Sequence, residues 1–145
     1  MKSKKKILIF GSSGLLGNYL FKNLKKNFRV FGCQHKNKNN NFFNIDISYI
    51  DQTTNIIKKI KPDIIINCIG YTDVINCEIN KIHAIKLNTL SVYNIISSLR
   101  DLKKKTHLIH ISTDQLYNNK NLLKKNFEKE INPLNFYGIT KMLGE

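Results

Sequence analysis

Long apolar runs are absent from this 145-residue sequence. The longest, Ile7-Leu8-Ile9-Phe10 and Ile64-Ile65-Ile66, fall far short of the roughly 20 apolar residues that a membrane-spanning helix needs. We expect the lysine-rich start, Met1 to Lys6, to be a solvated lead-in to a strand rather than a signal peptide, because a glycine-rich turn interrupts the apolar stretch that follows it. We therefore expect a globular, soluble protein of about one domain, with no membrane partner.

Cysteine is also scarce, and its spacing argues against two kinds of site. The three cysteines, Cys33, Cys68 and Cys77, are an odd number and form no C-x-x-C pair. Neither a disulfide framework nor a zinc site is indicated, and no metal ligands are expected. A reducing compartment fits this pattern best, so we expect a cytoplasmic location.

Arginine is nearly missing, although the net charge is +14. Arg29 and Arg100 are the only arginines, and lysine supplies the rest of the positive charge. Such a charge ordinarily suggests nucleic acid or an anionic membrane as partner. Arginine, however, is the preferred reader of phosphates and base edges, and asparagine and isoleucine are also heavily used. We interpret the lysines as a compositional bias, rank polyanion binding last, and expect no nucleic-acid partner.

Strand and helix signals alternate along the chain, which is typical of βαβ units. Strands are expected at 6–10, 29–33, 63–69 and 108–111, with a short extended segment at 42–47. Helices are expected at 15–27, at 80–104 and from about Asn135 onward. A further helix is expected to begin at a cap, Ser48 or Asp51, and to stop before Pro62. Loops are expected at 37–41 and 118–125. The pattern predicts an α/β fold, a Rossmann-like doubly wound parallel sheet that binds ligands beyond the carboxyl ends of its strands.

A glycine-spaced turn follows the first expected strand. Gly11, Gly14 and Gly17 recur every three residues between that strand and the next helix. Gly11 permits the tight turn, Gly14 lets backbone N–H groups approach a pyrophosphate, and Gly17 allows close packing of helix on strand. The spacing predicts a dinucleotide-binding loop, and an ordinary glycine-rich turn is the alternative.

The end of the second expected strand bears on which dinucleotide binds. A site that prefers NAD places Asp or Glu there to hold the ribose 2′-hydroxyl, but this sequence reads Cys33-Gln34-His35-Lys36. The missing acid and the basic character favour NADP, with NAD as the alternative. Asp46 lies further on, and two interpretations stay open: an acceptor for the adenine amino group, or a helix-capping carboxylate.

Hydroxyl and amine groups gather in the last third of the sequence. Ser112, Thr113 and Asp114 end the last expected strand, at the same sheet edge as the glycine turn. Tyr137 and Lys141 lie four residues apart, on one face of the last expected helix. Free tyrosine has a pKa of about 10, so a neighbouring cation is needed to make its phenolate accessible near neutral pH. A strand-end hydroxyl that bonds a carbonyl, with a tyrosine that supplies a proton as hydride arrives, indicates an oxidoreductase.

Taken together, these motifs resemble the extended short-chain dehydrogenase/reductases, and within them the dTDP-4-dehydrorhamnose reductase branch. The resemblance covers nearly the whole chain and keeps the order of the motifs. Besides the glycine turn, it rests on Lys61-Pro62-Asp63-Ile64-Ile65-Ile66-Asn67, Tyr71-Thr72-Asp73-Val74 with Cys77-Glu78, Leu87-Asn88, Ser112-Thr113-Asp114 and Asn132-Pro133-Leu134-Asn135-Phe136-Tyr137-Gly138-Ile139-Thr140-Lys141.

The resemblance implies roles for individual residues. Tyr137 would be the proton donor, Lys141 would lower its pKa and hold the nicotinamide ribose, and Thr113 would polarise the C4 ketone. Thr113 and Asp114 would face the sugar. Asn88 would help hold the active-site helix and a water; alternatively, it is a polar residue satisfied within its own helix. The implied cofactor-binding residues are Gly11, Ser13, Gly14, Leu15, Leu16, Gly17, Asp46, Ile47, Gly70, Tyr71, Thr72, Tyr137 and Lys141.

The implied activity is NAD(P)H-dependent reduction of a nucleotide-linked 4-keto-deoxysugar, as in dTDP-rhamnose biosynthesis. A homodimer is considered only for the full-length protein. The alternative is a non-catalytic nucleotide-binding subunit similar to the regulatory subunit of methionine adenosyltransferase, which the branch also resembles. Retention of Thr113, Tyr137 and Lys141 favours the enzyme.

The sequence departs from the family pattern in three ways. Cys68-Ile69-Gly70 replaces three small residues, so we expect Ile69 to crowd the cofactor, and Cys33 replaces an acid. The substrate-binding part of the family follows Lys141 and is missing. We therefore expect residues 1–145 to be an NAD(P)-binding Rossmann domain, incomplete at the C-terminus and inactive alone, from a truncated gene product or a sequence fragment.

Overall fold

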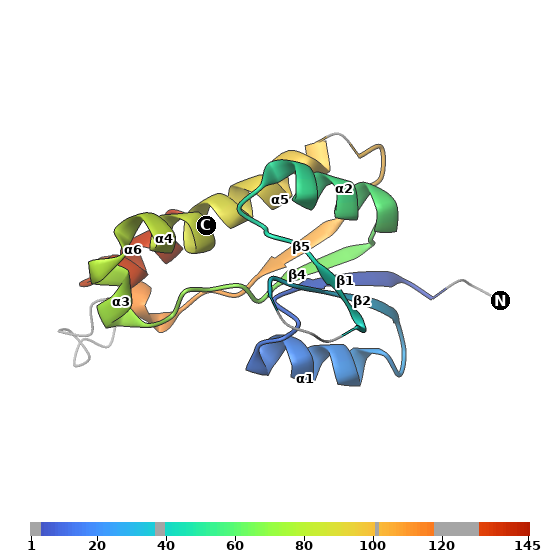
Figure 1. The fold of residues 1–145 in the computed structure, drawn as a ribbon, viewed down its shortest axis with the longest axis horizontal. Coiled ribbons are helices and arrows are strands. Elements are labelled where there is room, and N and C mark those ends of the chain that lie inside the picture. The colour runs from blue at the N-terminus through green and yellow to red at the C-terminus, as the bar shows by residue number, and fades with distance from the viewer. Residues whose placement is uncertain (1–3, 37–39, 101, 118–130) are drawn as a thin grey trace, which may run out of the picture. The chain divides into compact units, whose positions relative to one another are not determined.

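The computed structural model describes residues 4–36, 40–100, 102–117 and 131–145, which form two compact units (Figure 1). The first unit comprises residues 1–69 and 91–111, and the second comprises residues 70–90 and 112–145. The expected loop 118–125 and most of the expected loop 37–41 lie outside the described residues. The sheet belongs entirely to the first unit.

A five-stranded parallel sheet forms the centre of the first unit. Its order is β3-β2-β1-β4-β5, and its strands are β1 (Lys6–Phe10), β2 (Arg29–Gln34), β3 (Phe42–Asn44), β4 (Ile64–Asn67) and β5 (His107–His110). β1 pairs on both sides, and its residues Ile7 to Phe10 are buried. Such unbroken apolar runs suit strands that are covered on both faces. The predicted α/β fold with a Rossmann-like parallel sheet is confirmed.

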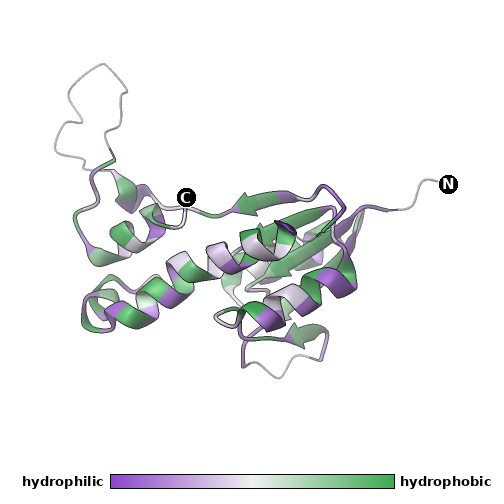
Figure 2. Cartoon of the chain, turned by 90° about the horizontal axis from the view of Figure 1, so that it is seen from above, coloured by the Kyte–Doolittle hydropathy of each residue, from purple (hydrophilic) through white to green (hydrophobic). Residues whose placement is uncertain are grey.

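Three helices cover this sheet, with α1 (Leu15–Leu24) on one face and α2 (Ile50–Ile60) and α5 (Ser91–Arg100) on the other (Figure 1). α1 packs through Phe21, whose ring meets that of Phe42 edge-on with centroids 4.8 Å apart. α2 and α5 are joined by a 2.8 Å hydrogen bond between the Thr54 and Ser98 hydroxyls. The strands are mostly hydrophobic, whereas the helices mix hydrophobic and hydrophilic residues (Figure 2). Each helix therefore turns an apolar side to the sheet.

Several predicted boundaries are corrected by the structure. α1 ends at Leu24 rather than near Asn27. α2 starts after Tyr49, which makes no side-chain cap, so the predicted caps Ser48 and Asp51 are wrong. The predicted end of α2 is confirmed, since Lys61 adopts a left-handed conformation with φ of 50° directly before Pro62.

Short helical segments build the second unit. They are α3 (Val74–Ile79), α4 (Lys81–Ile85), the π-helical turn η1 (Lys86–Leu90), the 3₁₀ turn η2 (Asp114–Leu116) and α6 (Phe136–Met142). α3 was not predicted; Asp73 caps it by accepting from the Asn76 N–H at 2.9 Å. The single helix predicted at 80–104 is divided by η1 and ends at Arg100. π-helical turns of this kind are frequent at functional sites.

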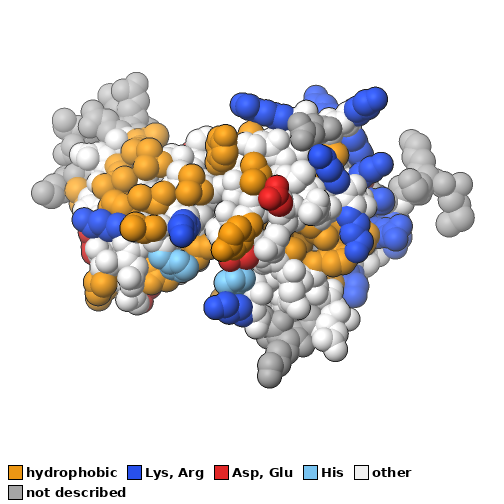
Figure 3. All heavy atoms as spheres, turned by 45° about the horizontal axis from the view of Figure 1, so that its top comes forward, with side chains coloured by type: hydrophobic (Ala, Val, Ile, Leu, Met, Phe, Trp, Pro, Cys, Tyr) orange, Lys and Arg blue, Asp and Glu red, His pale blue; other side chains and the backbone are white. Residues whose placement is uncertain are grey.

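The surfaces of the two units differ in chemistry. Lysine and arginine side chains gather over the first unit, whereas hydrophobic side chains gather over helices of the second (Figure 3). Ile75 and Ile79 of α3 and Ile82 of α4 are highly exposed, with 70–73% of each residue accessible. Within the described ranges, no helix combines the length and apolar character needed to cross a bilayer.

Candidate functional site

The glycine turn connects β1 to α1, as predicted. Gly11 has a φ of 80°, a left-handed conformation that favours glycine. The Gly14 N–H donates to the Gly11 carbonyl at 3.0 Å, and the Ser12 N–H donates to the Cys33 carbonyl in β2 at 2.9 Å. These bonds fix the turn to the carboxyl ends of β1 and β2.

The first turn of α1 presents its backbone to solvent. Gly14 is the N-cap residue, and no side chain caps the helix. Ser13, Gly14, Leu15 and Leu16 are exposed, Leu15 by 95%. Uncapped N–H groups at a helix N-terminus, together with the helix dipole, favour an anion. The backbone of the predicted loop residues therefore fits a pyrophosphate.

Gly17 and Gly14 allow the structural and the binding roles of this loop to be separated. A Cβ on Gly17 would lie 2.2 Å from the Gly11 carbonyl oxygen, whereas a Cβ on Gly14 would lie at an ordinary 3.4 Å from that atom. We expect Gly17→Ala to destabilise the fold by at least about 2 kcal/mol, because backbone atoms must move apart. Gly14→Ala should cost at most about 1 kcal/mol, the difference between glycine and alanine as an N-cap. Urea unfolding of both variants measures this contrast.

Gly14→Ala should nevertheless weaken dinucleotide binding, because its methyl group enters the space that the exposed first turn offers to the phosphates. A binding titration with NADPH checks this effect. Equal losses of stability in the two variants would contradict the close approach of Gly17 to Gly11.

The last positions of β2 carry no negative charge. Cys33 stands where an NAD-preferring site would hold an acid; its thiol is buried, and burial raises its pKa to about 12, so it stays neutral. Gln34 is also buried, and its amide donates to Asn44 at 2.7 Å. The next two residues, His35 and Lys36, are exposed. This end of β2 is therefore neutral to basic, in accord with the sequence.

Asp46 bonds within its own segment and to His35 rather than capping α2. Its carboxylate accepts from the N–H and hydroxyl of Ser48 at 3.0 and 2.7 Å, and His35 Nε2 lies 3.2 Å from its other oxygen. Burial alone would raise the pKa of Asp46, but the Ser48 hydrogen bonds and His35 hold it below its ordinary value. The helix-capping interpretation is wrong, and the adenine-acceptor role stays a prediction.

Two further residues predicted near the cofactor are packed within the first unit. Ile47 is 3% exposed, and its carbonyl accepts from the Asn94 amide at 2.9 Å. Ile69 lies beside the glycine turn, since a Cβ on Gly11 would be 3.2 Å from its Cγ1. The bulk of Ile69 is thus directed at the turn itself.

In the second unit, α6 carries Tyr137 and Lys141 one turn apart. The helix begins after Asn135, whose side chain accepts from the Gly138 N–H at 2.8 Å, which matches the predicted start. Tyr137 is 8% exposed and packs in a cluster with Cys77. Because the ring is packed and its helix is capped, the position of the Tyr137 hydroxyl is fixed.

Lys141 is almost completely buried, with 2% of the residue exposed. Burial lowers the pKa of Lys141 below its ordinary value, and the nearby Glu145 carboxylate partly offsets this effect. A cation in such surroundings has little competition from water, so it acts strongly on a neighbouring anion. It is placed on the correct helix face to stabilise a Tyr137 phenolate.

Asn88, in η1, is fully buried and ties two segments together. Its Oδ1 accepts from the Tyr71 N–H at 2.7 Å, while its Nδ2 donates to the Tyr71 carbonyl at 3.1 Å and to the Thr140 hydroxyl at 2.9 Å. The adjacent Thr89 hydroxyl donates to the Thr140 carbonyl at 2.7 Å. The alternative that Asn88 is satisfied within its own helix is wrong, because it anchors α6 to the Tyr71 segment.

Asn88→Ala is expected to lower the free energy of unfolding by about 2–4 kcal/mol, because buried groups of Tyr71 and Thr140 lose their partner. Asn76→Ala is the matched control, since the exposed Asn76 amide bonds only to Asp73 at the surface among the described contacts of that side chain. Chemical denaturation compares the two. A loss below about 1 kcal/mol for Asn88→Ala would contradict its anchoring role.

Thr113 immediately precedes η2, and its hydroxyl accepts from the Gln115 N–H at 3.3 Å and contacts the exposed Asp114 carboxylate at 3.3 Å. η2 packs on α6: Asn135 Nδ2 donates to Gln115 Oε1 at 2.9 Å, and a Cβ on Gly138 would lie 2.6 Å from the Gln115 carbonyl. Thr113, Tyr137 and Lys141 therefore belong to one compact unit, on segments that contact each other. Gly70 and Thr72 are exposed in the same unit.

Two residues in this unit have roles that the sequence did not indicate. Thr140 links Asn88 and Thr89 to α6, and Glu78 accepts from the Phe136 N–H at 2.7 Å in the first turn of α6. Glu78 follows Cys77 in a stretch that resembles the family, but its hydrogen-bond partner lies 58 residues away in the sequence. Local patterns could not have identified this contact.

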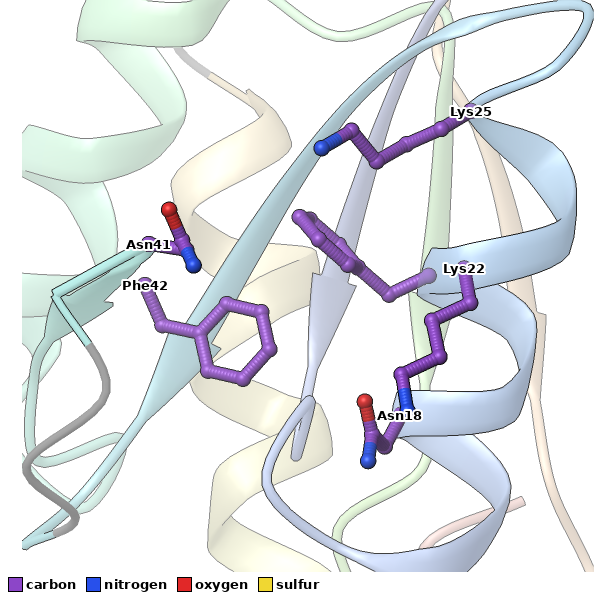
Figure 4. Close-up of a pocket in the computed structure, with 6 residues that line it drawn as sticks. Asn18, Lys22, Lys25, Asn41 and Phe42 are labelled. Atoms are coloured by element: carbon purple, nitrogen blue, oxygen red, sulfur yellow. The ribbon is translucent and has the colours of Figure 1, made fainter.

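A separate hollow of about 400 Å³ lies between α1 and the start of β3 (Figure 4). The Lys25 ammonium lies 4.9 Å from the centroid of the Phe21 ring, in cation–π range. None of the lining residues was a predicted site residue; they are Asn18, Phe21, Lys22, Lys25, Asn41 and Phe42. Among the described side chains, no group of three or more His, Cys, Asp or Glu is placed to hold a metal ion.

Residues 5–145 match the family model described as RmlD substrate binding domain. Three curated proteins are also similar to this chain. The chain is 30% identical to the dTDP-D-glucose 4,6-dehydratase of Dictyostelium discoideum over 94% of the chain and 38% of that protein. It is 30% identical to the dTDP-4-dehydrorhamnose reductase of Aggregatibacter actinomycetemcomitans, over 97% of this chain and 45% of that protein. It is 27% identical to methionine adenosyltransferase 2 subunit beta of Danio rerio, over 97% of this chain and 42% of that protein. The chain spans less than half the length of these relatives.

Solved structures show the same relationship. A hypothetical dTDP-4-dehydrorhamnose reductase from Sulfolobus tokodaii superposes with a TM-score of 0.85 at 32% identity, covering 96% of this chain and 50% of that one. The dTDP-4-dehydrorhamnose reductase from Bacillus anthracis, solved in complex with NADP, gives a TM-score of 0.80 at 26% identity, covering 99% and 49%. The chain has the fold of about half of each of these proteins.

Proposed function

This chain belongs to the RmlD substrate-binding domain family, and from that premise we propose that it is the nucleotide-binding part of an NAD(P)H-dependent reductase. Its substrate would be a nucleotide-linked 4-keto-deoxysugar, such as dTDP-4-dehydrorhamnose. The dTDP-sugar enzymes among its relatives support the substrate class. The NADP in the B. anthracis structure and the glycine turn after β1 support the cofactor class.

The observation that carries the catalytic part of the proposal is the fixed pair of Tyr137 and Lys141 on α6. Both residues are buried, and the Asn88–Thr140 bond holds their helix in place. A Tyr-x-x-x-Lys spacing on a solvated helix surface would mean little. Burial of an ammonium group costs stability, so a lysine kept at this buried position supports a functional role.

Reduction of a ketone to an alcohol requires a hydride at carbon and a proton at oxygen. Bound NADPH supplies the hydride from its nicotinamide ring. Tyr137 donates the proton from its hydroxyl to the carbonyl oxygen, and the O–H bond electrons remain on the phenolate. Lys141 stabilises that phenolate and binds the nicotinamide ribose, while the Thr113 hydroxyl polarises the carbonyl by donating a hydrogen bond.

A direct assay tests this function. The full-length protein is expected to consume NADPH, measured by absorbance, only when a nucleotide-linked 4-keto-sugar is added. Omitting the sugar nucleotide is the control for background oxidation. Absence of substrate-dependent consumption across dTDP-, UDP- and GDP-linked keto-sugars would overturn the proposal.

A second candidate function is a non-catalytic regulatory subunit. The observation that favours it is the similarity to methionine adenosyltransferase 2 subunit beta over 97% of the chain. Such a subunit would bind a dinucleotide and associate with a methionine adenosyltransferase catalytic subunit. Co-purification with that enzyme, without turnover of keto-sugars, would establish this second function instead.

A further inference from the structure

The hollow of the first unit, about 400 Å³ in volume, falls within the about 300–1,000 Å³ of small-molecule sites. One face of α1 and its C-cap lines it through residues at helical spacing: Asn18, Phe21, Lys22 and Lys25. Asn41 and Phe42 lie opposite, at the start of β3 (Figure 4). Among the described helices of this unit, α1 alone lies on its face of the sheet, so no second helix fills the space beside it.

Two phenyl rings give the hollow a fixed apolar surface. Phe21 and Phe42 are both buried, and their rings meet edge-on. Phe42 lies directly over Gly32 of β2, because a Cβ on Gly32 would be only 2.5 Å from the Phe42 Cδ1. The position of the Phe42 ring is therefore set by the sheet, and that of the Phe21 ring by α1. Aromatic rings held in this way offer a packing surface to another flat ring.

The polar side chains around these rings carry positive charge that no acid offsets. Lys22 and Lys25 are exposed, and the lining contains neither Asp nor Glu. The ion pairs of the described residues involve neither of the two lysines. The Lys25 ammonium instead lies over the Phe21 ring. The side-chain amides of Asn18 and Asn41 add neutral hydrogen-bond donors and acceptors. The hollow thus combines an apolar surface with two ammonium groups.

We propose that this hollow is a further ligand site, which binds a small aromatic phosphate. The flat ring of the ligand packs against Phe21 and Phe42, while its phosphate accepts hydrogen bonds from the two lysines. Lysine is a common point-charge partner of phosphate, and each ammonium supplies three donors to the phosphate oxygens. None of the lining residues belongs to the glycine turn, so the site does not depend on the proposed function.

Titration of the purified chain with phenyl phosphate tests the inference, followed by NMR shifts of the backbone N–H groups. Saturating NADPH is present, so that the glycine turn is occupied, at a salt concentration of about 0.15 M. We expect a Kd of about 1 mM or tighter, with the largest shifts in α1 and at the start of β3. Inorganic phosphate and benzyl alcohol should each bind at least about tenfold more weakly, because the first lacks the ring and the second lacks the charge.

Substitution of the lysines is the second arm of the test. Lys22→Gln combined with Lys25→Gln should weaken phenyl phosphate at least about tenfold, the usual effect of losing hydrogen bonds between charged groups. Lys26→Gln is the matched control, because Lys26 is exposed next to Lys25 but does not line the hollow; it should change the Kd by less than about twofold.

Three results would overturn the inference and leave the proposed function intact. They are a Kd for phenyl phosphate above about 10 mM, shifts centred on the glycine turn, and equal losses in the double variant and the control. If NADPH itself does not bind, the proposed function fails instead. The lysine variants, titrated without NADPH, then still decide whether the hollow binds an aromatic phosphate.

Discussion

Replacing Tyr137 with phenylalanine is expected to lower kcat for keto-sugar reduction about 10²- to 10⁴-fold in the full-length protein. The hydroxyl supplies the proton that the alkoxide needs, and phenylalanine has none to give. The ring, which packs beside Cys77 and Ala84, is retained, so the free energy of unfolding should change by no more than about 1 kcal/mol. Steady-state kinetics and denaturant unfolding of the same preparation measure both quantities.

Tyr93→Phe is the matched control for this substitution. Tyr93 lies on α5 and is 59% exposed, so removing its hydroxyl should alter neither turnover nor stability. NADPH affinity should be retained in both variants, because the phenol acts on the substrate. A Tyr137→Phe protein with undiminished kcat would rule out Tyr137 as the proton donor.

The sheet could be predicted because its strands are local features of the sequence. β1 and β4 are short unbroken apolar runs between turn residues, and the parallel order follows from the helices between them. The end of α2 was equally predictable, since the residue before Pro62 is restricted by the proline ring. Each of these signals depends on neighbours in the sequence.

The second unit was harder to predict because its order depends on distant contacts. α3 has six residues and no apolar period long enough to detect, and the π turn η1 interrupts a pattern that reads as one continuous helix. Asn88 occupies that turn and reaches Thr140, 52 residues away. A sequence pattern indicates that Asn88 is polar within an apolar helix, but it does not indicate the partner.

In the candidate site too, local features could be predicted from the sequence and distant contacts could not. The spacing of Gly11, Gly14 and Gly17 was sufficient to predict the turn, because Gly11 adopts a left-handed φ and Gly17 closely approaches the Gly11 backbone. The engagement of Asp46 by Ser48 and His35 was not predictable, since an aspartate after a strand can cap a helix, bind a ligand or orient a side chain equally well. Only the coordinates of its neighbours distinguish these roles.

Replacing Lys141 with methionine is expected to separate activity from stability. Turnover should fall at least about 100-fold, because the phenolate of Tyr137 loses its neighbouring cation. The free energy of unfolding should stay equal or rise by up to about 2 kcal/mol, since a buried charge is exchanged for an apolar chain of similar length. Lys86→Met, at an exposed position of η1, is the control and should affect neither quantity.

The stability difference between Lys141→Met and the wild type should depend on pH in a defined direction. The folded-state pKa of Lys141 is lowered by burial, so between that value and the unfolded value of about 10.4 the unfolded chain binds more protons than the folded chain. Wild-type stability from this group therefore rises with pH across that window, whereas methionine does not titrate. The stability advantage of Lys141→Met over the wild type should shrink as the pH is raised from neutral towards the unfolded pKa. If the free energy of unfolding of Lys141→Met instead falls by more than about 1 kcal/mol at neutral pH, the ammonium stabilises the fold. A charge kept only for catalysis would leave the fold no less stable when it is removed.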